Sequence, residues 1–126
     1  MTTPVLSAAV RELPALGEQI AETARPYIGD GLVLEVATGL DTADSNGYRD
    51  MVRTWRSPVR LLLLSIPDAA AAGDAYDDWV HWIAGGGLLA IADNEPLHTR
   101  ALASGKFRDL GTVADLHLLQ RIAACN

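Results

Sequence analysis

The sequence predicts an α/β fold in which helices cover both faces of a sheet of about five mostly parallel strands, a three-layer sandwich. Segments with helical spacing alternate along the chain with short apolar runs, which is the order expected when a sheet is built from parallel strands. The chain has 126 residues and 49% of them are apolar, which suits one domain over residues 1–126. A domain of this size buries enough surface to fold without disulfides or a structural metal.

The N-terminal part, residues 4–25, has apolar side chains at spacings of three and four, which predicts an amphipathic helix or a pair of helices. Pro14 is expected to break or kink this segment, because proline lacks the amide that the helical ladder needs. Pro26 and the glycines of residues 29–31 are expected to end it. A strand over residues 32–37 follows.

The remainder alternates in the same way. The expected elements are one short helix within residues 42–58, a strand at 60–65, a helix at 70–84, a strand at 88–92, a helix at 95–104, and an antiparallel hairpin of residues 107–113 and 116–122. The first three strands are apolar on both faces, as strands buried in parallel sheets are, so we expect them to be parallel to one another.

Charge and cysteine content exclude several classes of function. The net charge is −6, so neither nucleic acid nor an anionic membrane is an expected partner. No apolar run approaches the roughly 20 residues of a membrane span, and no secretory signal is expected at the N-terminus. The single cysteine, Cys125, makes no bridge within the chain and predicts a reducing, cytoplasmic location.

Three segments resemble the class I S-adenosylmethionine-dependent methyltransferases. Residues 31–39, Gly-Leu-Val-Leu-Glu-Val-Ala-Thr-Gly, are similar to the first strand and glycine loop of that family. Residues 84–94, Ala-Gly-Gly-Gly-Leu-Leu-Ala-Ile-Ala-Asp-Asn, resemble the helix end and fifth strand of its small-molecule O-methyltransferase branch, and residues 105–119 its closing antiparallel hairpin. The resemblance implies a shortened, Rossmann-like methyltransferase sheet and S-adenosylmethionine as the cofactor.

Two departures bear on that cofactor. Gly39 is the one glycine left in a loop that carries several in the family. Only 22 residues separate Ala37 from Arg60, whereas two complete strand–helix units need on the order of 60. The family's second and third strands are therefore expected to be missing, together with the acid that holds the cofactor's ribose, which predicts that cofactor binding is weak or lost.

The resemblance also implies roles for individual residues. Those implied to contact the cofactor are Glu35, Thr38, Gly39, Asp41 and Asp68. Asp93 and Asn94 are implied to hold the acceptor molecule, and His98 to act as the base that deprotonates it. Independently of the family, ligands of open parallel sheets sit beyond the carboxyl ends of the strands, where several of these residues fall.

Plainer structural roles compete with each of these assignments. Thr38 and Asp41 also suit a solvated loop, and His98 the surface of a helix. His81 is expected to be packed or solvated, and His117 to be structural. No metal site is expected, because Ile66 stands near the place where the family's metal-dependent branch has a ligand.

Two functions remain open at this point. One is an S-adenosylmethionine-dependent methyltransferase that acts on a small molecule. The other is a non-catalytic relative, a pseudo-methyltransferase that serves as a binding or assembly partner. Loss of the family's outer strands would leave residues 32–37 as an edge strand, which predicts a homodimer, or a heterodimer with a protein of related fold.

Overall fold

The computed structural model describes residues 6–11, 18–28, 32–38, 47–92, 94–113 and 115–122. The elements are β1 (Leu6–Arg11), α1 (Glu18–Ile28), β2 (Val33–Thr38), α2 (Gly47–Thr54), β3 (Val59–Ser65), α3 (Ala69–Trp79), the 3₁₀ turn η2 (Val80–Trp82), β4 (Ile83–Ala92), α4 (Glu95–Ala103), β5 (Phe107–Val113) and β6 (Leu116–Arg121). The chain is thus α/β, as its sequence predicts.

The strands form one mixed sheet in the order β1-β2-β3-β4-β6-β5. The three central strands β2, β3 and β4 are parallel, as predicted. The hairpin of β5 and β6 is also confirmed, and β6 lies between β4 and β5, antiparallel to both. The sheet is mixed: β2, β3, β4 and β5 run in one direction, and β1 and β6 run in the other. It has six strands where about five were expected, because β1 was not among the predicted strands.

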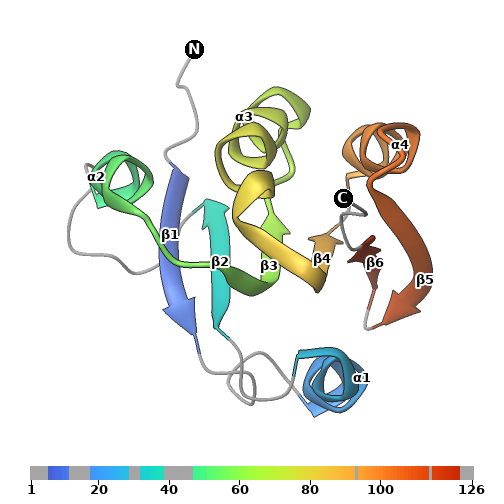
Figure 1. Cartoon of the computed structure of the whole chain (residues 1–126). Helices are drawn as coiled ribbons and strands as arrows, with labels where there is room; N and C mark the ends of the chain where they lie inside the picture. Colours follow the sequence, from blue (N-terminus) through green and yellow to red (C-terminus); the bar gives the residue numbers. More distant parts are fainter. Residues whose placement is uncertain are drawn as a thin grey trace.

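Helices lie on both sides of this sheet (Figure 1). One face packs against α1 through a cluster that includes Ala24, Ile28 and Leu88. The other face packs against α2, α3 and α4 through a larger cluster that includes Leu62 and Trp79. Both clusters draw on β3, whose Leu61–Leu64 side chains are all buried, because a strand covered on both faces is apolar at every position.

The first strand corrects only the first part of the helix or pair of helices predicted over residues 4–25. The second part is confirmed by α1, which continues through Pro26 to Ile28 and does not end at the proline as expected. Leu6–Arg11 pairs with β2 in an unbroken antiparallel register from Leu6↔Thr38 to Arg11↔Val33. Helical spacing and strand alternation both fit this short stretch, and Pro14 limits any helix there to a length that is marginal in isolation. Pairing with β2, with Ala8 buried against the core, decides in favour of the strand.

The same pairing corrects the position of the sheet's edge. The strand predicted at residues 32–37, here Val33–Thr38, lies between β1 and β3 and is not an edge strand. The edge on this side is β1. The dimer expected from an exposed strand at 32–37 therefore loses its original premise.

Consecutive glycines shape the start of β4. Val59 pairs with Ile83, but Leu61 pairs with Leu88, so β4 has three extra residues and bulges there. Gly86 adopts φ +83°, a conformation that residues with a Cβ rarely adopt. A Cβ on Gly87 would lie 3.0 Å from the Arg60 carbonyl oxygen and 2.9 Å from that of Ala84, so the close approach of β3 to β4 requires glycine.

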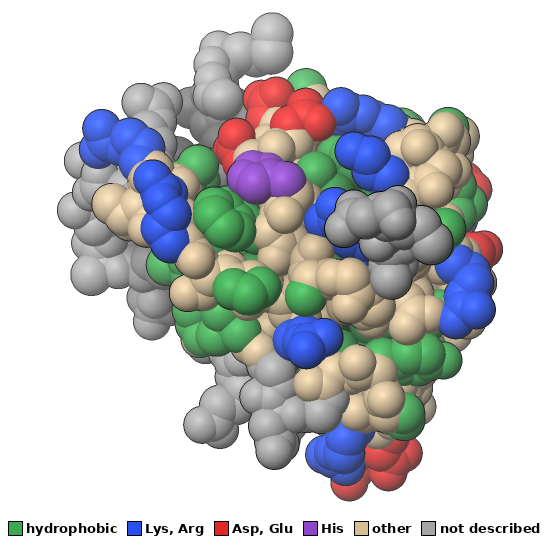
Figure 2. Space-filling model, in the orientation of Figure 1, with side chains coloured by type: hydrophobic (Ala, Val, Ile, Leu, Met, Phe, Trp, Pro, Cys, Tyr) green, Lys and Arg blue, Asp and Glu red, His purple; other side chains and the backbone are tan. Residues whose placement is uncertain are grey.

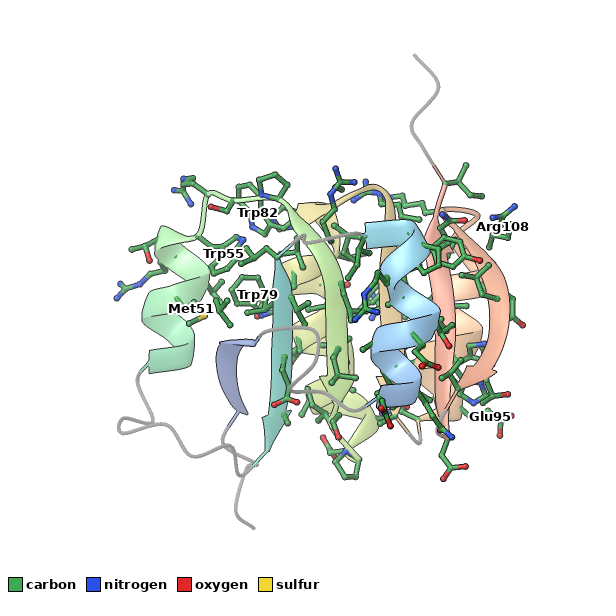
Figure 3. The ribbon with its side chains drawn as sticks, turned by 90° about the horizontal axis from the view of Figure 1, so that it is seen from below. Met51, Trp55, Trp79, Trp82, Glu95 and Arg108 are labelled. Atoms are coloured by element: carbon green, nitrogen blue, oxygen red, sulfur yellow. The ribbon has the colours of Figure 1, made fainter. Side chains whose placement is uncertain are left out.

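Three tryptophans cluster near one end of the sheet. The rings of Trp55 and Trp79 meet edge to face, with centroids 5.3 Å apart and planes at 87°. Figure 3 places these two residues with Met51 and Trp82 at one corner of the view, and Glu95, which begins α4, at the opposite corner. The aromatic side chains are therefore part of the core under α2 and do not line the carboxyl ends of the strands.

Candidate functional site

The carboxyl ends of β3 and β4 meet in a small polar cluster. The two strands are parallel up to the pair Leu64↔Ile91, which brings the residues that follow them together. The Asn94 side-chain amide Nδ2 donates a hydrogen bond to the Ile66 carbonyl oxygen at 3.0 Å. Asn94 is only 3% exposed, so this bond ties the two strand ends together in a buried setting.

Asn94 also begins α4. Its Oδ1 accepts a hydrogen bond from the Leu97 amide at 3.3 Å, as an N-cap side chain does. Pro96 stands in the first turn, where its missing amide costs no helical bond. Both ends of the carboxamide thus serve the fold, and a role for Asn94 in holding an acceptor stays a prediction.

His98 and His117 form a stacked pair beside this cluster. His98 is half-buried in the first turn of α4, and its ring lies over that of His117 with centroids 4.0 Å apart and planes at 17°. His117 comes from β6, where it pairs with Ile91 of β4. Directly paired residues share a face of a sheet, so His117 lies on the same side of the sheet as α4.

The Nε2 atom of His98 is buried and has no hydrogen-bond partner among the described residues. Buried polar atoms usually have a partner, so this ring nitrogen is an unsatisfied donor or acceptor, depending on its tautomer. A neutral imidazole nitrogen is also a suitable general base at physiological pH. The pair therefore offers an acid–base group at the end of the sheet where ligands of α/β proteins bind.

Sequence reasoning missed His117 as a member of this site. The hairpin was predicted, but its register against the preceding strand was not, and only that register sets His117 beside Ile91. A signal was present, because an antiparallel strand folding back on residues 88–92 must bring some of its residues next to the Asp93-Asn94 end.

Asp68 has a structural role at the end of β3. It is the N-cap of α3, and its Oδ2 accepts a hydrogen bond from the Ala71 amide at 2.8 Å. The residue is exposed and stands two positions after Ile66, whose carbonyl receives Asn94. It thus belongs to the same edge of the sheet, and contact with a cofactor stays a prediction.

The structure separates the residues expected around the first parallel strand. Thr38 ends β2, so its backbone lies on the same edge of the sheet as the Asn94 cluster. Glu35 pairs with Leu63, a residue of the cluster under α1, which puts Glu35 on the face of the sheet opposite to His98. Gly39, Asp41 and Asp93 lie outside the described residues.

The acidic residues of α3 lie on its solvent-exposed face. Asp74 and Asp77 are exposed, and Asp77 makes an ion pair with Arg100 of α4 at 2.6 Å. Figure 2 shows acidic side chains gathered over α3, with Lys and Arg side chains in separate places across the rest of that face. Exposed ion pairs of this kind contribute about 0–1 kcal/mol, so these residues form a solvated helix face.

The arrangement of the described titratable residues bears on the question of a metal site. Among the residues that the structure describes, no group of three or more His, Cys, Asp or Glu could hold a metal ion. The stacked rings of His98 and His117 lie nearly parallel, and in-plane nitrogen lone pairs of parallel rings do not converge on one cation at the 2.0–2.1 Å or so that imidazole ligands require.

We expect millimolar Mg²⁺ or Ca²⁺ to leave the melting temperature unchanged. These hard cations take six or more oxygen ligands, and the Asp68 carboxylate and Asn94 carboxamide already bind backbone amides. Thermal unfolding in each metal, compared with EDTA, checks this. A rise in melting temperature that Asp68→Ala removes would instead identify a cation site at this edge.

No protein-family model matches this chain.

Proposed function

We propose that the chain is a shortened relative of the class I S-adenosylmethionine-dependent methyltransferases that acts on a small molecule at the carboxyl ends of β3 and β4. The sheet order supports this, since β6 is inserted antiparallel between β4 and β5, in agreement with that family's closing hairpin. Helices on both faces (Figure 1) suit the three-layer, Rossmann-like arrangement of the family.

The stacked imidazole pair carries the proposal. The buried Nε2 of His98 has no partner among the described residues and stands in the helix that follows Asn94, the residue implied to hold the acceptor. In this proposal His98 takes the proton of an acceptor hydroxyl, while His117 holds its ring in place by stacking at 4.0 Å. The larger contribution of such a site is the positioning of the reacting groups.

The cofactor fits the described residues poorly. In the family an acid at the end of the neighbouring strand binds the ribose hydroxyls. Here the strand beside β2 is β1, and the residue paired with Thr38 is Leu6, which offers no hydrogen bond from its side chain. Glu35 is on the other face of the sheet. Neither Leu6 nor Glu35 therefore suits the role of the family's ribose-binding acid, so we propose that S-adenosylmethionine binds weakly, and a complete loss of binding would favour the non-catalytic alternative below.

Calorimetric titration with S-adenosylmethionine and S-adenosylhomocysteine tests the cofactor site. Losing a carboxylate that bonds two hydroxyls costs about 1.5–3 kcal/mol for hydrogen bonds to a charged group, which is roughly a ten- to hundredfold loss of affinity. We expect binding weaker than a working methyltransferase shows, or none. A dissociation constant in the micromolar range or below would contradict an incomplete site.

One variant makes the titration more specific. Leu6→Asp returns a carboxylate to the strand beside Thr38 and should tighten binding if a remnant of the cofactor site exists. Val10→Asp, in the same strand but near its other end, is the matched control for the added charge. Equal effects of the two variants on the dissociation constant would show that the gain in affinity does not arise at the cofactor site.

The second candidate function is that of a non-catalytic pseudo-methyltransferase, and the same Leu6↔Thr38 pair favours it. A chain of this kind would bind a protein partner and would bind neither S-adenosylmethionine nor S-adenosylhomocysteine in the titration. A cytoplasmic location is part of either proposal and rests on the single cysteine. No described helix has the length and apolar character needed to cross a membrane.

A further inference from the structure

The two edges of the sheet differ in how they are protected against pairing with another strand. The β5 edge is irregular: its register shifts between Asp109 and Gly111, and Gly111 adopts φ +101°. The Asp109 carboxylate accepts a hydrogen bond from the Gly111 amide, and the exposed charges of Arg108 and Asp109 follow one another there. Bulges and charged side chains are the usual means of keeping an edge strand unpaired.

The β1 edge has none of these features. Its register against β2 is continuous over all six residues, with no shift. Its sequence, Leu-Ser-Ala-Ala-Val-Arg, contains no proline or glycine and carries its single charge at the last position. No described strand pairs with its outer side, and Val10 is 51% exposed.

Such an edge is a ready template for another extended backbone. In an antiparallel strand alternate residues direct their N–H and C=O groups to one neighbour, and the residues between them direct theirs the other way. The outward groups of β1 are a regular row of donors and acceptors. Water can hydrate such a row, but another strand matches its spacing and satisfies it throughout, which makes a regular edge a template for strand pairing.

We infer that a second copy of this chain covers the β1 edge, so that two sheets join into one across a two-fold axis. A strand that pairs antiparallel with its own copy forms an interface in which each contact occurs twice. With Ala8 opposite Ala8 of the second copy, Val10 lies opposite Leu6 of that copy. Arg11 then falls outside the overlap, so no like charges face each other.

This pairing also accounts for the exposed Val10. Ala8 belongs to the cluster beneath α2, α3 and α4, and Val10, two residues on, shares that face of the strand. Pairing with Leu6 of the second copy covers an apolar side chain that the single chain leaves open to solvent. The inference does not rest on the acceptor site proposed at the carboxyl ends of β3 and β4, although Leu6 lies both beside Thr38 and in this interface.

Sedimentation of the full chain at micromolar concentration tests the inference, with an expected mass of twice 13.4 kDa. Val10→Lys should raise the dimer dissociation constant roughly tenfold, because it replaces two symmetric apolar cross-strand pairs and sets a charge on the edge. Thr112→Lys, an exposed position on the β5 edge, adds the same charge and should leave the dimer unchanged. A monomeric wild type, or equal effects of both variants, would overturn the inference.

Hydrogen exchange supplies a readout that does not depend on a variant. Amides of β1 should be protected in the concentrated protein and should exchange faster on dilution below the dissociation constant. Protection that does not change with concentration would mean that another segment of the same chain covers β1. That result would refute the dimer whether or not the cofactor titration succeeds.

Discussion

Trp79→Ala should lower the free energy of unfolding by about 3–5 kcal/mol, the range found when large aromatic residues are removed from a core. Trp79 is fully buried and packs edge to face on Trp55. Its loss leaves a cavity between α2, α3 and the sheet that small neighbours such as Ala72 and Ala75 cannot fill. Because native domains are stable by only about 5–15 kcal/mol, we expect a large fall in melting temperature.

Trp82→Ala is the matched control, since it removes the same side chain three residues further on. Trp82 is only half-buried and lies beside the exposed His81, with ring centroids 5.1 Å apart, so its replacement should cost clearly less. Urea unfolding followed by far-ultraviolet circular dichroism measures both variants, because this signal comes mainly from the backbone. A Trp82→Ala variant at least as destabilised as Trp79→Ala would contradict the packing described for α2 and α3.

Asn94→Ala should lower the free energy of unfolding by about 2–4 kcal/mol, because it removes a helix cap and leaves a buried carbonyl without a hydrogen bond. The amide of Asn94 binds the Ile66 carbonyl at 3.0 Å, and its Oδ1 binds the Leu97 amide at 3.3 Å. Removing both bonds disconnects the end of β3 from the start of α4. The helix that carries His98 then loses its anchor, so the stacked imidazole pair should loosen as well.

Two further variants separate the contribution of the helix cap from that of the bond to Ile66. Asp68→Ala removes an exposed cap with one hydrogen bond to Ala71 and should cost only the ordinary price of a cap, about 1 kcal/mol. Asn94→Ser keeps a cap acceptor but is too short to reach Ile66. We expect Asn94→Ser to lie between the other two in urea unfolding. Equal losses for Asn94→Ala and Asp68→Ala would mean that the bond to Ile66 contributes nothing measurable.

The position of the polar cluster could be predicted from the sequence, but few of its contacts could. The rule that ligands sit beyond the carboxyl ends of parallel strands directs attention to Thr38, Asp68 and Asn94, and the structure puts all three at that edge. Glu35 shows the limit of the approach. Strand alternation predicts that the Glu35 side chain lies on the opposite face of the sheet from those of Leu34 and Val36. Which of the two faces α4 covers depends on how the chain crosses the sheet.

The sequence by itself determined the order of the elements from residue 32 onward and the parallel order of the central strands. Their buried apolar runs and the helix caps are local signals, as Asn94 before Pro96 illustrates. The helix expected at 70–84 is wrong at its end, because α3 stops at Trp79 and β4 already begins at Ile83. Only the tertiary structure decided that Leu6–Arg11 is a strand, because its spacing suits both a helix and a strand and the bonds to β2 resolve the choice. The stacking of His98 on His117 was likewise decided in three dimensions, since it depends on the register of β6 beside β4, a long-range pairing that no local pattern specifies.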